Sequence, residues 1–142
     1  MKKINIIVID PSPIIQIGFK TLFKNSSKFE LIECFNTIYD FKEFIKSNNV
    51  DIIITELKLS DGDAYDILKS IRLIKKEIPV LIFTSKPQSL HAISILKSGA
   101  VGYLSKNSKK RQIKETLEKI ALQNFNFIET NSFTRLKNNF NE

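Results

Sequence analysis

The chain has 142 residues, 42% hydrophobic and 26% charged, and its 22 basic and 15 acidic side chains give a formal net charge of +7. This length favours one domain whose core can fold without disulfides, and the lone Cys34 has no second cysteine to pair with. No apolar run approaches the roughly 20 residues of a membrane helix, no signal-peptide pattern follows Met1, and the four glycines do not form a phosphate-binding loop. We therefore expect a cytoplasmic protein that binds no membrane.

Short apolar runs typical of strands alternate with helical apolar patterns along the first part of the chain. A β-branched run predicts a strand at 4–9, which the Asp10-Pro11-Ser12-Pro13 segment ends. Ser12 followed by Pro13 is typical of a helix N-cap. The predicted elements that follow are a helix with the apolar stripe Ile14, Ile17, Phe19, Leu22 and Phe23, a strand at 29–35, and a helix that Asn36 or Thr37 can cap.

The same alternation continues to about residue 123. A continuous apolar run at 52–54 is typical of a strand buried on both faces. The next predicted elements are a helix after the Asp61-Gly62-Asp63 turn, a strand at 80–83, a helix from about 89 to 98 ending at Gly99, a strand at 101–104, and a helix that Ser108 can cap. Five strands alternating with five helices predict an α/β fold with a doubly wound parallel sheet covered on both faces.

The pattern changes at about residue 124. The last 19 residues are rich in asparagine and carry isolated phenylalanines. We expect one domain at 1–123 and a linker-like tail at 124–142, which could include a short helix from about Ser132, but no second domain.

Polar side chains stand where the predicted strands end. In open α/β sheets, ligands bind at the carboxyl ends of the strands. Two carboxylates, a hydroxyl and an ammonium group are therefore expected to converge at one edge of the sheet: Asp10, Glu56, Thr84 and Lys106.

Four motifs carry a family resemblance: Val-Ile-Asp10, Asp51-Ile-Ile-Ile-Thr-Glu56-Leu-Lys-Leu, Phe83-Thr84-Ser85, and Leu96-Lys-Ser-Gly99-Ala-Val-Gly102-Tyr103-Leu-Ser-Lys106. From residue 4 to about 120 the chain resembles the receiver domain of bacterial two-component response regulators, of the NarL/FixJ (LuxR-type) subfamily. The resemblance implies a flavodoxin-like (βα)5 fold with strand order 2-1-3-4-5. It also implies a signalling module in a phosphorelay, active in transcription regulation and not an enzyme.

The resemblance assigns roles to individual positions. In this family an aspartate after the third strand accepts a phosphoryl group, and two acids after the first strand join it in holding Mg²⁺. Lys106 and Thr84 match the residues that contact the phosphoryl group, Tyr103 matches the aromatic switch, and Asp10 matches the first acid. Two positions depart from the pattern: Pro11 replaces the second acid, and Glu56 replaces the phospho-accepting aspartate.

These departures predict an atypical receiver. Losing one carboxylate removes a metal ligand, and the extra methylene of Glu56 displaces the attacking oxygen in a reaction that depends on in-line positioning. We expect no resident metal, weak or lost Mg²⁺ binding and no other cofactor.

Two interpretations of Glu56 stay open. Its carboxylate could reach Lys106 and Thr84 and imitate phospho-aspartate, or it could only neutralise Lys106 and leave the switch elements unbiased.

Other polar residues have simpler explanations. Asp61 and Asp63 lack a calcium-loop pattern and fit a turn with an N-cap, and Asp51 stands at the wrong end of its strand. His91 is expected to be solvated and Cys34 to belong to the core. The basic run Lys106, Lys109, Lys110, Arg111 and Lys114 is interpreted as a solvated helix face rather than a phosphate-binding patch.

Three hypotheses on function follow. The first is a module that acts by contact with a protein partner or as a homodimer, through the fourth helix, fifth strand and fifth helix or through the first and fifth helices. The second is the receiver half of a NarL/FixJ-type DNA-binding regulator, whose helix-turn-helix domain is absent from these 142 residues. The third, an ordinary phosphoacceptor, is disfavoured by Pro11 and Glu56.

Overall fold

The computed structural model describes residues 2–123 and confirms the α/β fold with a five-stranded parallel sheet. The sheet has the order β2-β1-β3-β6-β7, which is the expected 2-1-3-4-5 pattern once a small separate hairpin is left out of the numbering. Its strands are β1 (Ile4–Ile9), β2 (Phe29–Phe35), β3 (Ile52–Thr55), β6 (Val80–Thr84) and β7 (Gly102–Ser105).

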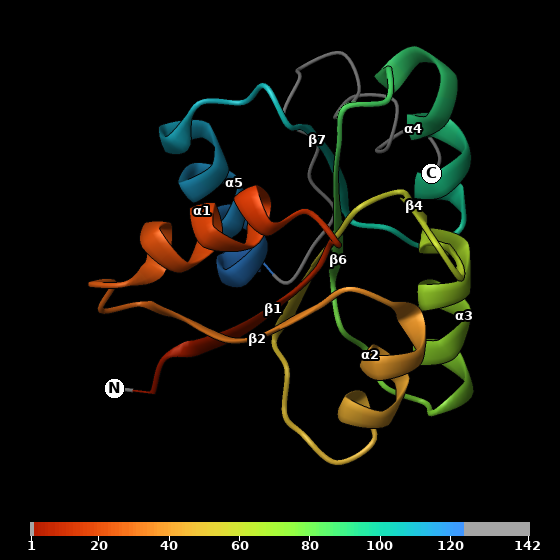
Figure 1. Cartoon of the computed structure of the whole chain (residues 1–142), viewed down its shortest axis with the longest axis horizontal. Helices are drawn as coiled ribbons and strands as arrows, with labels where there is room; N and C mark the ends of the chain where they lie inside the picture. Colours follow the sequence, from red (N-terminus) through yellow and green to blue (C-terminus); the bar gives the residue numbers. More distant parts are fainter. Residues whose placement is uncertain (1, 124–142) are drawn as a thin grey trace.

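Five helices cover the two faces of the sheet (Figure 1). Helices α1 and α5 lie on one face, and α2, α3 and α4 lie on the other. The helices are α1 (Pro13–Phe23), α2 (Ile38–Ile45), α3 (Ala64–Leu73), α4 (Gln88–Lys97) and α5 (Lys110–Gln123).

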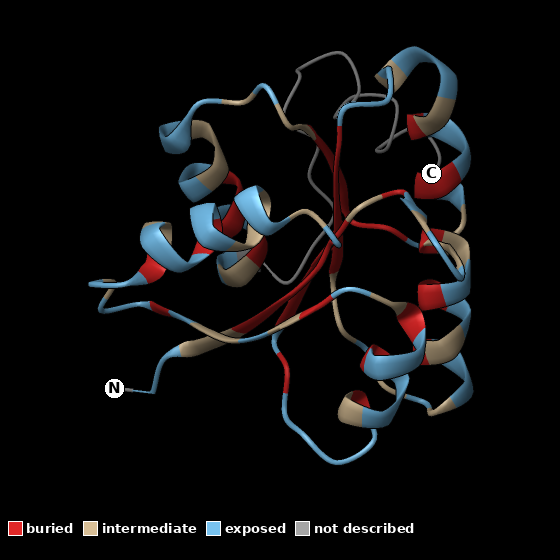
Figure 2. Cartoon of the chain, in the orientation of Figure 1, coloured by how far each residue is buried: buried red, intermediate tan, exposed pale blue. Residues whose placement is uncertain are grey.

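Alternate side chains of the central strands enter two separate cores. Ile7 and Ile9 of β1 pack toward α2, α3 and α4, whereas Ile6 and Val8 pack toward α1 and α5. Figure 2 shows the strands as the most deeply buried part of the molecule, with the exposed residues on the outer helix faces. Burial on both faces explains why these strands are continuous apolar runs.

Most predicted helix ends are confirmed. The Ser12 hydroxyl accepts a hydrogen bond from the Ile15 amide at the start of α1, and Thr37 caps α2. Gly99 follows α4 with φ of +117°, a conformation that favours glycine. Helix α5 instead begins at Lys110, two residues after Ser108, and the Lys109 amide donates to Oε1 of Gln112.

The predicted stripe of α1 is wrong in part. Phe19 and Phe23 are buried, but Ile14 and Ile17 are 75% and 58% exposed. The predicted Leu22 is partly buried and packs against the core on the α1 and α5 side, and so does Ile15, which the prediction left out. Ile14 and Ile17 stand on the outer side of the helix, because a 3.6-residue period places them away from Phe19 and Phe23.

A hairpin absent from the sequence prediction joins β3 to α3. It consists of β4 (Lys58–Leu59) and β5 (Gly62–Asp63). The Asp61 carboxylate accepts hydrogen bonds from the Ile38 and Tyr39 amides at the start of α2, and Asp63 caps α3. This confirms the turn-and-cap interpretation, and it shows that the turn also ties α2 to the segment after Glu56.

The predicted tail at 124–142 and its boundary lie outside the described residues. Within the described range no helix is long and apolar enough to cross a bilayer.

Candidate functional site

The carboxyl ends of four strands bring the predicted polar residues together. Asp10, Glu56 and Lys106 each follow the last residue of a strand, and Thr84 ends β6. The ladder continues one residue beyond the strands, since the Glu56 amide donates to the Ile9 carbonyl and the Lys106 amide to the Thr84 carbonyl, both at 3.0 Å. Backbone pairing therefore fixes the backbone positions from which the Glu56 and Lys106 side chains extend.

Lys106 lies between two carboxylates. Its Nζ is 2.9 Å from Oδ2 of Asp10 and 2.8 Å from Oε1 of Glu56. Burial alone would lower the pKa of Lys106, but its hydrogen bonds to Glu56 and Asp10 outweigh that effect and raise the pKa above the ordinary lysine value. The ammonium group is thus held charged in a site with little access to solvent.

Glu56 uses both of its carboxylate oxygens. Oε1 contacts Lys106, while Oε2 accepts a hydrogen bond from the Leu57 amide. Burial would raise the pKa of this carboxyl, but hydrogen bonds from Lys106, Thr84 and Leu57 outweigh it and leave the pKa below the ordinary glutamate value. Glu56 is therefore an anion held by three donors.

Asp10 is the most deeply buried charged residue of the site, at 2% exposure. Its Oδ1 accepts a hydrogen bond from the Ser12 amide at 2.9 Å. Its Oδ2 is buried and has only the ion pair with Lys106 among the described residues. Pro11, exposed on the rim, contributes no side-chain oxygen.

The donor set does not fit a resident Mg²⁺ ion. Mg²⁺ requires near-octahedral oxygen coordination. The site offers two carboxylates, and an ammonium group already lies within 2.9 Å of an oxygen of each. In residues 2–123 no three His, Cys, Asp or Glu side chains gather in a way that could hold a metal. The position of Lys106 and the proline at 11 are the physical reasons for the misfit.

Tyr103 lies fully buried in β7 and points its hydroxyl at the β6–α4 connection. The hydroxyl donates to the backbone carbonyl of Lys86 at 3.0 Å. The Lys86 amide donates to the Thr84 hydroxyl oxygen at 3.2 Å. Burial, followed by the nearby charges of Glu56 and Tyr65, raises the pKa of Tyr103 to about 12. The backbone of Lys86 is thus held on one side by Thr84 and on the other by Tyr103.

Lys86 and the Leu57 amide are the site residues that sequence reasoning missed. Both contribute backbone groups to these contacts, and a backbone group leaves no side-chain signal in the sequence. The only available signal was position: Leu57 directly follows Glu56, and Lys86 comes two residues after Thr84.

A shallow hollow of ≈ 420 Å³ lies over the strand ends. It is lined by Asp10, Pro11, Ser12, Glu56, Lys58, Lys86 and Lys106. Both acids of its lining are paired with Lys106, and two further cations line it: Lys86, and Lys58, whose ammonium lies 3.9 Å from the Asp63 carboxylate.

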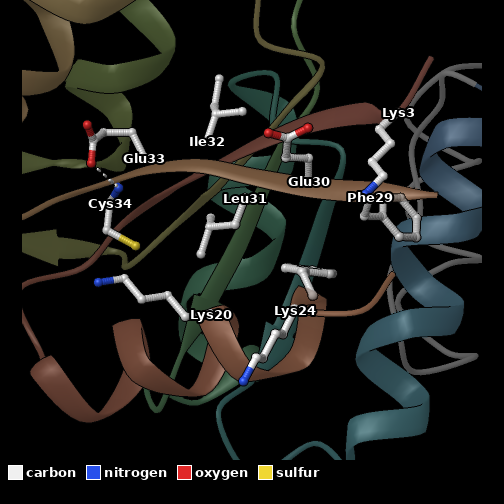
Figure 3. A pocket seen from close by; sticks show the side chains of 10 residues that line it. Lys3, Lys20, Lys24, Phe29, Glu30, Leu31, Ile32, Glu33 and Cys34 are labelled. Carbon is white, nitrogen blue, oxygen red and sulfur yellow. Dashed lines mark hydrogen bonds between the residues drawn. The ribbon is translucent and has the colours of Figure 1, made fainter. Parts of the chain in front are cut away.

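A second hollow, of ≈ 410 Å³, lies between α1 and the edge strand β2, away from the strand ends (Figure 3). Lys20 of α1 and Lys24, which directly follows α1, line it, as do Glu30 and Cys34 of β2. Cys34 is only partly buried, although it packs against the core, and burial raises the pKa of its thiol. A raised thiol pKa disfavours the reactive thiolate, so the expectation of a packing role for Cys34 stands.

The remaining candidates lie away from the site. Asp51 accepts a hydrogen bond from the Asn5 amide at 2.7 Å, at the opposite end of the sheet. His91, expected to be solvated, is of intermediate burial on α4.

Comparison with known proteins supports a single family. The model of the response regulator receiver domain matches residues 6–118. Fimbriae Z protein of Escherichia coli K12 is 25% identical over 139 residues, which span 98% of this chain and 66% of that protein. The chain thus covers slightly less than two thirds of this relative.

Solved structures show the same fold. The receiver domain of the putative regulator NarL from Mycobacterium tuberculosis has a TM-score of 0.80 at 19% identity, covering 87% of this chain and 99% of that one. A LuxR-family regulator from Aurantimonas has a TM-score of 0.83 at 18% identity, covering 99% of both chains. A structure described as two RcsB dimers bound to two parallel DNAs has a TM-score of 0.82 at 16% identity, covering 96% of this chain and 69% of that one. With its parallel sheet and the residues gathered at the strand ends, this chain belongs to the response regulator receiver domain family.

Proposed function

We propose that this chain is an atypical receiver module that signals through protein contacts without being phosphorylated. The observation that carries this proposal is the Lys106 ammonium, which bonds Glu56 and Asp10 at 2.8 and 2.9 Å. In this arrangement one ammonium group pairs with both carboxylates, so Glu56 already has a cationic partner without a phosphoryl group or a metal ion, and the three groups together carry a net charge of −1.

The geometry of the site makes Glu56 a poor nucleophile. One oxygen contacts the Lys106 ammonium and the other accepts from the Leu57 amide, and the lowered pKa marks a carboxylate stabilised by its donors. Attack on a phosphoryl donor requires a free, aligned oxygen and a metal ion that neutralises the transferring group. Pro11 and the pairing of Asp10 with Lys106 remove the ligands for that metal ion.

The contacts of Glu56 favour imitation of phospho-aspartate over simple neutralisation of Lys106. Both Lys106 and Thr84 hydrogen-bond the Glu56 carboxylate, and these are the two side chains that contact the phosphoryl group in the family. Tyr103 stands at the position of the family's aromatic switch. Its side chain is buried and donates a hydrogen bond to the Lys86 carbonyl, so it faces inward. One carboxylate charge replaces nearly two on a phosphoryl group, so the imitation is partial.

Signalling through contact requires an exposed surface. Two surfaces are candidates: α1 with α5, where Ile14 and Ile17 are exposed, and α4 with β7 and α5. A homodimer and a role in transcription regulation are both consistent with what is known of similar proteins. One of the similar structures is described as RcsB dimers bound to DNA. The alternative function is the receiver half of a DNA-binding regulator, which the relatives of greater length favour. Sequencing the genomic reading frame beyond codon 142 distinguishes the two.

A phosphodonor assay tests the proposal. Wild-type protein is incubated with acetyl phosphate and Mg²⁺ and read by intact mass, and we expect no phosphoryl adduct. The double variant Pro11→Asp/Glu56→Asp should regain acceptance, while each single variant regains it poorly. The double variant is the positive control for the assay, and a stable adduct on the wild-type protein would contradict the proposal.

A further inference from the structure

Strand β2 forms one edge of the sheet, and among the described residues it pairs with β1 alone (Figure 1). At its start, the Ile4 amide donates to the Lys28 carbonyl, and at its end the Asp10 amide donates to the Phe35 carbonyl. Successive residues of a strand direct their backbone groups to opposite sides. The backbone groups that face the open edge therefore belong to three residues on either side of a bulge: Phe29, Leu31 and Cys34.

Two of these outward amides are covered by nearby side chains. The Phe29 amide donates to the Ser26 hydroxyl at 2.9 Å. The Cys34 amide donates to Oε1 of its neighbour Glu33 at 3.2 Å (Figure 3). In the part of the chain that the structure describes, no side chain is bonded to the Leu31 backbone in this way. Leu31 therefore presents a donor and an acceptor to a strand that lies beside it.

The charges near this edge are separated by face. Glu30 and Glu33 point away from α1, whereas Lys20 and Lys24 lie on the α1 side of the strand (Figure 3). Both lysines are exposed, and neither forms an ion pair with another described residue. The α1–β2 groove, defined here by Lys20, Phe23, Lys24 and residues 29–34, is therefore basic on its α1 side.

We propose that the α1–β2 groove binds an extended segment of a partner protein, which adds as a strand to the open edge of β2 and directs acidic side chains toward α1. In strand addition, main-chain hydrogen bonds give affinity and alternate side chains give specificity. The hollow of ≈ 410 Å³ beside β2 offers room for those side chains. This inference goes beyond the proposed function, because it does not depend on whether Glu56 is phosphorylated.

The two lysines favour a partner protein over a second copy of this chain. If two copies joined these edges as antiparallel strands about a twofold axis, both α1 helices would lie on the same face of the joined sheet. Lys20 and Lys24 of one copy would then face the same lysines of the other, cation against cation. A partner strand with acidic residues on that face meets attraction instead.

Strand β2 also carries features that limit what can pair with it. Its register shifts at Ile32, and charged residues flank this bulge at Glu30 and Glu33. Bulges and charged side chains protect edge strands from pairing at random. A partner strand must displace the Glu33 carboxylate from the Cys34 amide and must be short or bend at Ile32, so the edge is selective.

Fluorescence anisotropy with the full chain tests the inference. The probe is a labelled peptide of about eight residues that alternates glutamate with threonine, a residue that favours strands. The same peptide with lysine for glutamate tests the charge. Two N-methylated forms, one methylated at the glutamate amides and one at the threonine amides, test backbone pairing, because only alternate amides of a strand face its neighbour.

Two charge reversals are compared on the protein side. Lys20→Glu/Lys24→Glu changes the groove. Lys110→Glu/Lys114→Glu changes two exposed lysines with the same four-residue spacing on α5, outside the groove, and alters the net charge equally. Circular dichroism verifies that each variant is folded.

We expect the glutamate peptide to bind at low salt, to lose about tenfold or more in affinity with Lys20→Glu/Lys24→Glu, and to change within about twofold with the control reversal. One methylated peptide should lose binding and the other should keep it: loss at the glutamate amides indicates an antiparallel strand, and loss at the threonine amides a parallel one.

Four results would overturn the proposal: no binding of the glutamate peptide, equal binding of the lysine peptide, equal effects of the two reversals, or equal binding of the two methylated peptides. If sedimentation shows a dimer that the peptide dissociates, β2 pairs with a second copy and the inference is wrong. Tighter binding of a DNA duplex than of the peptide, lost in Lys20→Glu/Lys24→Glu, would replace it with a nucleic-acid surface.

Discussion

The Lys106 ammonium lies 2.8 Å from Oε1 of Glu56 in a partly buried site, with the glutamate side chain 14% exposed. Because Lys106 also reaches Asp10, two carboxylates share one ammonium group, and the three groups carry a net charge of −1. The three charges therefore depend on one another, and the cost of removing one depends on which one is removed.

Lys106→Met should destabilise the protein more than Glu56→Gln. The lysine variant leaves both carboxylates unpaired in a buried site, at a cost of roughly 3–5 kcal/mol. The glutamine variant keeps the Lys106–Asp10 pair and should lose about 1–2 kcal/mol. Urea unfolding measures both differences. Equal losses would mean that Asp10 and Glu56 do not share the ammonium group.

The stability conferred by Glu56 should vanish in acid. Its pKa lies below the ordinary glutamate value in the folded state, so its contribution is complete above the ordinary value of about 4.3 and is lost as pH falls through the folded pKa. The free energy of unfolding of wild type should therefore exceed that of Glu56→Gln near neutral pH and approach it in acid. Curves that stay parallel across this range would rule out the pairing of Glu56 in the folded state.

The Tyr103 phenol should titrate at about pH 12. Its raised pKa means that the neutral phenol is favoured by folding, so this stability is complete below pH 10 and is lost as pH rises through about 12. Ultraviolet absorbance after a rapid pH jump, with Tyr103→Phe subtracted, isolates this group from Tyr39 and Tyr65. Glu56→Gln should lower the midpoint, because it removes a nearby negative charge. A Tyr103 midpoint near 10 in wild type would show an exposed phenol.

Gly62→Ala and Gly18→Ala should have opposite effects on stability. Gly62 has φ of +152°, and an added Cβ would lie 2.5 Å from Oδ2 of Asp66 and 2.7 Å from Cδ1 of Ile38. We expect a loss of roughly 1–3 kcal/mol at this hairpin. Gly18 lies inside α1 with nothing within 4 Å of the added Cβ, so alanine should stabilise by about 0.5–1 kcal/mol. Thermal melts of the two variants against wild type provide the comparison, and a stabilising Gly62→Ala would disprove the described hairpin geometry.

The sheet could be predicted from the sequence because its strands are buried on both faces. Runs such as 4–9 and 52–54 have no competing helical period, and their predicted bounds lie within one residue of the strands. The β4–β5 hairpin could not be predicted, because strands of two residues have no periodicity. In α1 two apolar stripes overlap, so the sequence did not show that Ile14 and Ile17 are exposed.

The sequence predicted the types of residue at the site but not the contacts between them. The position of Glu56 after a buried strand predicted its place at the sheet edge. Whether its carboxylate reaches Thr84 depends on rotamers and on a backbone amide, Leu57, that no pattern identifies. The link between Tyr103 and Lys86 has the same origin, since the acceptor is a carbonyl group.

Amide ¹H–¹⁵N spectra test most directly whether Glu56 holds Thr84 and Tyr103 in place without phosphorylation. We expect Glu56→Gln to shift the resonances of Thr84, Lys86 and Tyr103, and beryllofluoride with Mg²⁺ to leave the wild-type spectrum unchanged. Unchanged resonances in Glu56→Gln, together with beryllofluoride-induced shifts in wild type, would contradict it.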